Sequence, residues 1–329
     1  MSQVSVALCM HNGAAFIREQ IRSICRQTHA PSEIVISDDA STDDGVEIAK
    51  AAFDECAREN ADQRIEIVLL QNPKALGVTR NFEQAATHCR GELVMLCDQD
   101  DAWHPHRLAR LRAEFERRPE LLLLHSDARL VDARNRSLGG SLFHALEVRP
   151  AELACIHDGR AFDALLHRNL VTGATAVFRR SLLDHALPFP EEWLHDEWLA
   201  IIAAAVGRVD VLEEELIDYR QHDHNQIGAR RESFLQKVQR ALMPSGDSQS
   251  QMAVKAEKLL AQMLRLVGQV EVEKIGLVFD KLEHQRFRAQ LPNSRLARIL
   301  PIAHEALKGH YARVGRGGKG IVRDLLQPK

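Results

Sequence analysis

Leu93-Val94-Met95-Leu96-Cys97-Asp98-Gln99-Asp100-Asp101 places an apolar run directly before three carboxylates. A near-continuous apolar run is typical of a strand buried in a parallel sheet, and ligands of open α/β sheets bind beyond the carboxyl ends of the strands. Carboxylates this close repel one another unless a positive group lies among them. A hard divalent cation that also holds a substrate phosphate meets that need. The alternative is an acidic turn that caps the helix after Trp103, because Asp favours turns and N-caps.

Strands and helices alternate on both sides of this stretch. Apolar runs predict strands at Ser5–Met10, Glu33–Ser37, Arg64–Leu70 and Leu121–Leu124, and helical spacing predicts helices at Phe16–Arg26, Val46–Glu59, Val78–Cys89 and Pro105–Arg117. The alternation indicates a doubly wound, mostly parallel α/β sheet with helices on both faces. The second strand also ends in carboxylates, Asp38 and Asp39. Because parallel strands end at one edge, we expect both acidic groups to face one crevice, which favours a binding site over a simple turn.

The second half of the sequence is less regular. We expect turns and loops over Arg134–Arg149, a Gly-bearing turn and strand over Thr172–Phe178, and short strands at Val209–Leu212 and Leu216–Tyr219. Helical periodicity then predicts helices over Phe234–Met243 and Met252–Phe287. We therefore predict a sheet domain over residues 1–229 and a basic, mainly helical extension over residues 230–329.

Charge differs between these two parts. Residues 230–329 carry 19 Lys+Arg against 9 Asp+Glu, whereas residues 1–229 carry 24 against 37, although the net charge is only −3. Such an asymmetry indicates either a basic appendage that meets an anionic surface or a solvated helical tail. We interpret the surface as that of a membrane, and we predict no nucleic-acid partner.

The six cysteines are scattered without Cys-X-X-Cys pairs, several of them in apolar runs. This pattern indicates small buried side chains in a reducing cytoplasm rather than disulfides or zinc ligands. The sequence shows no basic-then-apolar signal segment, and no apolar run reaches the ~18 residues that a membrane span needs. We therefore expect a cytoplasmic protein whose membrane contact is peripheral and made through its C-terminal part.

Two phosphate-binding motifs are missing. The sequence contains neither GxGxxG after the first strand nor GxxxxGK[ST], and the first strand–helix turn carries only Gly13. A Rossmann dinucleotide site and a P-loop are therefore not supported. A sugar nucleotidyltransferase is disfavoured because it needs a Gly-rich basic loop at that turn. A diphosphate is most simply held by a metal ion at the Asp cluster.

Several motifs together resemble one enzyme family. Val4–Gly13, Ser32–Asp43, Asn72–Phe82 and Cys97–Trp103 are similar, in order and spacing, to family 2 glycosyltransferases with the GT-A fold. Thr172–Thr175, His195–Ala200 and Tyr219–Gly228 are similar to the rhamnosyltransferase-like branch, so the resemblance covers roughly residues 3–228. It implies an inverting, metal-dependent hexosyltransferase of bacterial surface polysaccharide synthesis. The donor would be a dTDP- or UDP-sugar, rhamnose among the candidates, and the acceptor a saccharide or lipid-linked glycan.

The resemblance implies a donor nucleotide site at the second strand. Asp39 would bind the nucleotide base, and Asp38 beside it would be more structural. Cys9 and His11 would border the base. Arg80 could pair with the diphosphate through its guanidinium group, or it could be an exposed residue at a helix start.

The resemblance also implies a metal site for Mg²⁺ or Mn²⁺ at the opening stretch. Asp98 and Asp100 would be the ribose and metal carboxylates. The additional Asp101 leaves two candidates for direct contact with the ion, of which we favour Asp100. His222 would be a further metal or diphosphate contact, with an ordinary surface histidine as the alternative.

Asp196 would be the general base, a role that implies loss of a proton from the acceptor hydroxyl during attack. It precedes a helix of small apolar residues, and a helix N-terminus favours an ionised carboxylate. Two alternatives stay open: Asp196 could be an N-cap, or Glu197 could be the base in a register shifted by one residue. A non-catalytic nucleotide-sugar-binding protein of the same fold is the alternative function.

Overall fold

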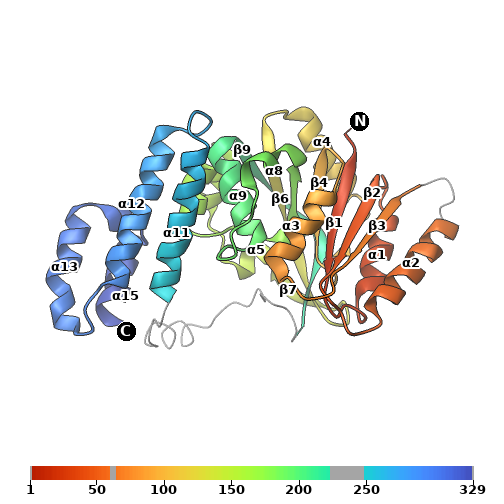
Figure 1. Ribbon diagram of the computed structural model, residues 1–329, viewed down its shortest axis with the longest axis horizontal. Coiled ribbons are helices and arrows are strands. Elements are labelled where there is room, and N and C mark those ends of the chain that lie inside the picture. The colour runs from red at the N-terminus through yellow and green to blue at the C-terminus, as the bar shows by residue number, and fades with distance from the viewer. Residues whose placement is uncertain (1, 60–63, 223–247, 328–329) are drawn as a thin grey trace. The chain divides into compact units, whose positions relative to one another are not determined.

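The structure, a computed structural model, describes residues 2–59, 64–222 and 248–327. The predicted helix over Phe234–Met243 lies outside the described residues. The chain divides into two compact units, one formed by residues 1–161 and 170–230 and the other by residues 162–169 and 231–329 (Figure 1). Residues 162–169 therefore group with the C-terminal helices, whereas the sequence-based division assigned them to the sheet domain.

The first unit contains, in its described residues, a nine-stranded sheet in the order β3-β2-β1-β4-β8-β6-β9-β5, with β7 paired to β6. The strands are β1 (Val4–Met10), β2 (Glu33–Asp38), β3 (Glu66–Gln71), β4 (Leu93–Cys97), β5 (Ala102–Trp103), β6 (Leu121–Asp132), β7 (Ser137–Ser141), β8 (Ala176–Arg179) and β9 (Arg208–Gln221). The first four pair in parallel, and β8 lies antiparallel between β4 and β6. The predicted mostly parallel α/β sheet is confirmed.

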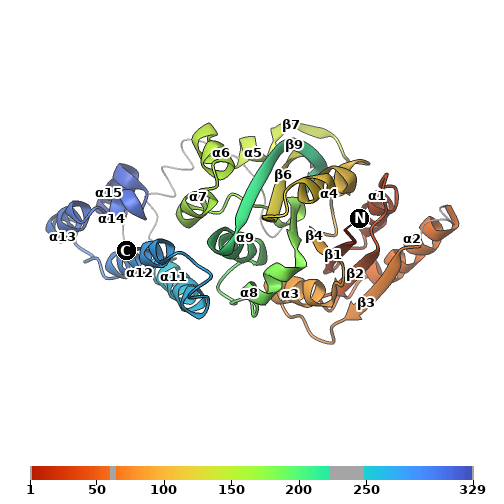
Figure 2. The same cartoon turned by 90° about the horizontal axis from the view of Figure 1, so that it is seen from above.

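Helices cover both faces of this sheet, as the view from above shows (Figure 2). One face carries α1 (Ile17–Cys25), α2 (Gly45–Glu59) and α4 (Arg107–Arg117), and the other carries α3 (Val78–His88) and α9 (His195–Val206). Shorter helices are α5 (Leu142–Ala145), α6 (Pro150–His157) and α8 (Leu183–Ala186).

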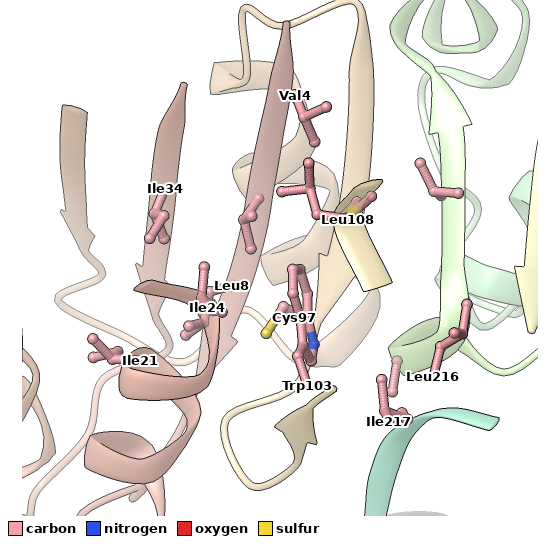
Figure 3. Close-up of a cluster of buried hydrophobic side chains, with 14 of the residues drawn as sticks. Val4, Leu8, Ile21, Ile24, Ile34, Cys97, Trp103, Leu108, Leu216 and Ile217 are labelled. Atoms are coloured by element: carbon pink, nitrogen blue, oxygen red, sulfur yellow. The ribbon is translucent and has the colours of Figure 1, made fainter. Parts of the chain in front are cut away.

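The main core lies between the sheet and the first of these helix layers. Leu8 and Cys97 pack there with Ile24, Trp103 and Leu108 (Figure 3). β1, β2 and β4 are buried along their whole length. Burial on both faces is why these strands read as continuous apolar runs rather than alternating ones.

Two predictions for the middle of the chain are wrong. Residues 134–149 are not only turn and loop, because they contain β7 and α5. The exposed sequence of β7, Ser-Leu-Gly-Gly-Ser, offers no apolar run to indicate a strand. The two short strands predicted at 209–212 and 216–219 form one strand, β9. Three exposed glutamates, Glu213 to Glu215, interrupt its apolar pattern without interrupting the strand.

The second unit is helical, as predicted. It contains α11 (Ser248–Arg265), α12 (Val272–Ala289), α13 (Arg295–Leu307), α14 (His310–Arg313) and α15 (Gly317–Leu326), together with most of α7 (Ala161–His167). The single helix predicted over 252–287 is wrong, because the chain turns at Gly268, whose φ is +93°. Leu291, Ile302 and Tyr311 form a small apolar core. No described helix is both long enough and apolar enough to cross a membrane.

Trp198 anchors α9 to the rest of the first unit. Its side chain is fully buried, and its indole N–H donates to the Ala186 carbonyl at 2.7 Å. Trp198→Ala is expected to lower the free energy of unfolding by ~3–5 kcal/mol, because it removes a large core side chain and leaves a cavity. Denaturant unfolding followed by circular dichroism measures the change. Trp198→Phe, which keeps most of the volume, should cost less, and equal losses in both variants would contradict the packing argument.

Candidate functional site

The carboxyl ends of β1, β2 and β4 lie at one edge of the sheet. The parallel register pairs Met10 with Asp38, and β4 pairs with β1 on its other side. A reciprocal pair of hydrogen bonds joins the turns: the His11 N–H donates to the Gln99 side-chain oxygen at 2.8 Å, and Gln99 Nε2 donates to the His11 carbonyl at 3.0 Å. The fold therefore places the two acidic strand ends at the same edge.

Four carboxylates gather at this edge, three from the end of β4 and Asp196 from α9. Burial, together with the charges of Asp100 and Asp196, raises the pKa of Asp98 to about 8. The pKa of Asp101 also lies well above its ordinary value, because of burial first and then the charges of Asp100 and Asp98. Carboxylates that repel in this way are stabilised when a cation is bound among them.

Asp100 and Asp101 differ in what they contact. Asp100 Oδ2 lies 2.7 Å from His222 Nε2, and both side chains keep some solvent exposure. The His222 ring stacks on Phe16 with ring centroids 4.9 Å apart. Asp101 is only 2% exposed, and its Oδ1 accepts the Arg220 backbone N–H at 3.0 Å. Its Oδ2 has no hydrogen-bond partner within the part of the chain that the structure describes.

Arg220 is a site residue that the sequence reasoning missed. It is 1% exposed, its Nε donates to the Asp100 carbonyl at 2.6 Å, and its Nη2 donates to Glu19 at 2.7 Å. The guanidinium also lies over the Phe16 ring, 4.8 Å from its centroid. Arg220 thus fixes the backbone that carries the acidic turn. The only sequence feature that could have indicated a role for Arg220 was its position in the Tyr219–Gly228 motif.

Asp39 connects the second strand to the loop before α3. Its Oδ1 accepts the Leu76 N–H at 2.6 Å and its Oδ2 accepts the Gly77 N–H at 3.0 Å. Arg80 lies in the first turn of α3, where it pairs with Glu83 at 3.1 Å and approaches Glu191 at 3.7 Å. Both ion-pair partners of Arg80 among the described residues are thus glutamates outside the carboxylate cluster.

The other predicted donor residues line the same edge. Asp38 accepts the hydroxyl and the backbone N–H of Ser41, which is a structural role within the turn. His11 Nδ1 lies 2.7 Å from the Asp39 carbonyl oxygen. Cys9 is buried, and its thiol pKa is raised well above the ordinary value by burial and then by Asp98. The Cys9 thiol therefore stays protonated and lines the site without acting as a nucleophile.

Asp196 lies in the first turn of α9. The N-cap residue is Leu194, so the alternative in which Asp196 is the N-cap is wrong. Asp196 Oδ1 accepts the Glu197 N–H at 2.7 Å, and its Oδ2 accepts the Gly173 N–H at 2.9 Å. A Cβ atom at Gly173 would lie 2.7 Å from His195 Nε2, so glycine permits this close approach. Two fixed N–H donors orient the carboxylate.

The donor atoms at the end of β4 fit Mg²⁺ or Mn²⁺, which prefer carboxylate oxygen ligands and accept an imidazole. Among the described residues, the only ion pair of Asp98, Asp100 or Asp101 is the one between Asp100 and His222. Asp101 Oδ2 has no partner among the described residues, and burial with neighbouring carboxylates raises the pKa of Asp98, so a divalent cation held among these carboxylates would offset their repulsion.

The family model for glycosyl transferase family 2 matches residues 5–187. The chain belongs to this family. The matched region of this family 2 member includes the acidic ends of β2 and β4 but stops before Asp196 and His222. An uncharacterized glycosyltransferase of Nostoc sp. is 26% identical over 234 residues, 68% of this chain and 66% of that protein.

A second relative is named for O-antigen biosynthesis. The O-antigen biosynthesis protein RfbC of Myxococcus xanthus is 30% identical over 132 residues, 40% of this chain and 10% of that protein. The chain thus matches less than two thirds of the length of either relative.

Solved structures share the fold at low sequence identity. TarS 1–349 of S. aureus, in complex with UDP-GlcNAc, has a TM-score of 0.59 and 17% identity, covering 98% of this chain and 89% of TarS. The mannosyltransferase PcManGT of Pyrobaculum calidifontis, in complex with GDP-Man and Mn²⁺, has a TM-score of 0.50 and 16% identity, covering 98% and 86%. These likenesses confirm the predicted GT-A fold.

Proposed function

We propose that this protein is an inverting, metal-dependent glycosyltransferase that moves a sugar from a nucleoside diphosphate donor to a saccharide or lipid-linked acceptor. The observation that carries the proposal is the proximity of Asp196 to Asp98, whose pKa its charge raises, although α9 and β4 are far apart in the sequence. One side of the site is suited to a leaving diphosphate, and the other offers an oriented carboxylate base.

In this proposal the sugar is transferred in a single displacement, and the site residues take separate roles in it. Asp100 and His222, with Asp101 as the alternative carboxylate, would hold the metal ion beside the donor diphosphate, and Asp98 would contact the ribose of the donor. When bound, Mg²⁺ or Mn²⁺ stabilises the negative charge that develops on the departing diphosphate. Asp196 accepts the proton of the acceptor hydroxyl as that oxygen attacks the anomeric carbon from the opposite face. Configuration at that carbon is therefore inverted.

The donor in this proposal is a dTDP- or UDP-sugar whose base lies against Cys9, His11 and Asp39. TarS has been solved with UDP-GlcNAc, which supports a uridine donor for this fold. Rhamnose is the sugar that the downstream motifs suggest. The O-antigen relative supports an acceptor in bacterial surface polysaccharide synthesis.

A donor panel tests the proposal. Purified protein is incubated with Mn²⁺ and a set of dTDP-, UDP- and GDP-sugars, and release of the nucleoside diphosphate is measured with and without a saccharide acceptor. Thermal shifts with the corresponding nucleoside diphosphates identify the bound base, because a ligand of the folded state stabilises it by mass action. We expect Mn²⁺-dependent release with one donor. Tight nucleotide binding without turnover would instead favour the non-catalytic binding protein, and pyrophosphate release would favour a nucleotidyltransferase.

We further propose that the protein works at the cytoplasmic face of a membrane, with residues 1–229 as the catalytic domain and residues 230–329 as an extension that contacts lipid. None of the six cysteines forms a disulfide, which suits a reducing compartment. Within the extension, α13 exposes Leu296, Leu300 and Leu307 by 80–87%. These residues share one face of the helix, and basic side chains lie at both its ends, a pattern typical of interfacial helices.

Replacing the three exposed leucines of α13 by serine is expected to lower binding to anionic vesicles at least ~10-fold, because each exposed leucine contributes apolar area to the bilayer contact. Co-sedimentation with phosphatidylglycerol vesicles measures it, and binding should weaken at high salt. Val272→Ser, which changes an 82% exposed residue on α12, is the control. Equal binding of all three proteins would refute the contact.

A further inference from the structure

The second unit contains a buried group of metal-ligating side chains. His284 on α12, Glu305 on α13 and His310 on α14 place their ligand atoms within 4.8 Å of one another. His284 Nδ1 lies 3.0 Å and His310 Nδ1 2.8 Å from the same carboxylate oxygen, Glu305 Oε1. Two imidazole nitrogens and one carboxylate oxygen thus converge from three helices on one point.

Two of the three side chains are almost fully buried. His284 and Glu305 are 1% and 3% exposed. Oε1 of the Glu305 carboxylate lies between the two imidazole rings. Lys308 approaches the other oxygen of this carboxylate only to 4.0 Å.

Two further groups lie beside the imidazole rings. Asp280 Oδ1 lies 4.0 Å from His310 Nε2, the ring nitrogen that faces away from Glu305, and Arg313 holds Asp280 at 2.8 Å. Tyr311 packs edge-on against His284 with ring centroids 4.6 Å apart. Metal-binding histidines commonly direct their second ring nitrogen to a carboxylate, which fixes the tautomer.

We propose that His284, Glu305 and His310 form a binding site for a divalent transition metal ion, with Zn²⁺ as the best match. Two nitrogen ligands and one carboxylate favour Zn²⁺ over Mg²⁺ or Ca²⁺, which prefer oxygen ligands. Zinc bonds of about 2.0–2.1 Å place neighbouring ligands ~3.3 Å apart in a tetrahedron. The observed nitrogen–oxygen distances need to open by only a few tenths of an ångström, with water as a fourth ligand.

The bound ion would have a structural role in the second unit rather than a catalytic one. α12, α13 and α14 are joined by short connections around the small core of Leu291, Ile302 and Tyr311. An ion that links all three helices stabilises their packing by its binding free energy. The carboxylate cluster of the first unit uses different residues and different ligand chemistry, so the two sites can be tested independently.

The test uses the full chain carrying Asp100→Asn and Asp101→Asn, so that the acidic site does not compete for the metal. The protein is freed of metal with a chelator and titrated with Zn²⁺ by calorimetry, and the melting temperature is recorded with and without Zn²⁺. We expect one strongly bound Zn²⁺ per chain and a higher melting temperature. His310→Gln should weaken binding at least ~100-fold as a lost ligand, and Asp280→Asn should weaken it by less, because it removes only a negative charge 4.0 Å from His310 Nε2.

His304→Gln is the matched control, because His304 is an exposed histidine on α13 close to Glu305 in sequence. It should bind Zn²⁺ like the parent. Asp280→Asn changes no proposed ligand, so it keeps the test informative if His310→Gln does not fold. The proposal is wrong if the parent gains no stability from Zn²⁺, or if the His304 and His310 variants bind equally. In that case the three side chains form only a proton-bridged network.

Discussion

Asp196→Asn is expected to reduce glycosyl transfer by ~10²–10⁴-fold, the usual contribution of a general base. The amide cannot accept the acceptor's proton, but it nearly preserves the size and shape of the side chain. One of the two N–H groups that Asp196 accepts, from Gly173 and Glu197, would lose its partner. A small loss of stability is therefore expected beside the large loss of turnover. Initial rates with saturating donor measure the effect.

Donor binding separates a lost base from a damaged site. Asp196→Asn should bind nucleoside diphosphate and Mn²⁺ about as well as the parent, because Asp196 acts on the acceptor side. Glu197→Gln is the matched control, one residue further along the same helical turn. If Glu197→Gln abolishes transfer while Asp196→Asn remains active, the base is Glu197. Loss of donor binding in Asp196→Asn would remove the distinction and contradict the proposed role.

The acidic edge of the sheet could be predicted because it depends on local signals and one rule of topology. A buried parallel strand has a continuous apolar sequence, and its end is marked where carboxylates begin. β2 and β4 both show this pattern, and their shared edge follows from parallel pairing with β1. The separate roles of Asp38 and Asp39 needed the turn geometry, which places Ser41 on one carboxylate and the Leu76–Gly77 backbone on the other.

Arg220 could not be predicted because its burial depends on the continuity of β9. The exposed run Glu213–Glu215 suggested two short strands, the second of which ended at Tyr219, so Arg220 was expected to lie beyond the sheet. The structure instead continues β9 to Gln221 and pairs it with β5, with Ala102 opposite Asp218. That pairing brings Arg220 under the acidic turn. Tertiary contacts of this kind leave no periodic trace in the sequence.

The His284, Glu305 and His310 cluster was invisible for a related reason. Each residue lies on a different helix, and no regular spacing connects them. The prediction of one helix over residues 252–287 also concealed the turn that lets α12 pack beside the later helices. In the sequence, the two histidines give no sign of a binding site within the basic C-terminal part. Only the packing of the second unit brings them together.

Asp100→Asn is expected to lower Mn²⁺-dependent turnover by at least ~10²-fold, the scale of losing one group that stabilises charge in a transition state. Asp100 is the carboxylate of the β4 turn that reaches His222, whereas Asp101 is almost fully buried and accepts the Arg220 N–H. Asp100→Asn should therefore weaken Mn²⁺ binding, measured by calorimetry in the presence of nucleoside diphosphate, with little change in melting temperature.

Asp101→Asn should mainly lower stability rather than Mn²⁺ affinity, because Asp101 supports the pairing between the acidic turn and β9. Its melting temperature should fall, while Mn²⁺ affinity in the folded fraction changes less than in Asp100→Asn. The opposite pattern would assign the direct metal contact to Asp101, whose Oδ2 would then turn toward the ion. His222→Asn tests whether His222 is also a metal ligand. If it lowers Mn²⁺ affinity as much as Asp100→Asn does, both side chains bind the ion, because each variant then removes one ligand from the same site.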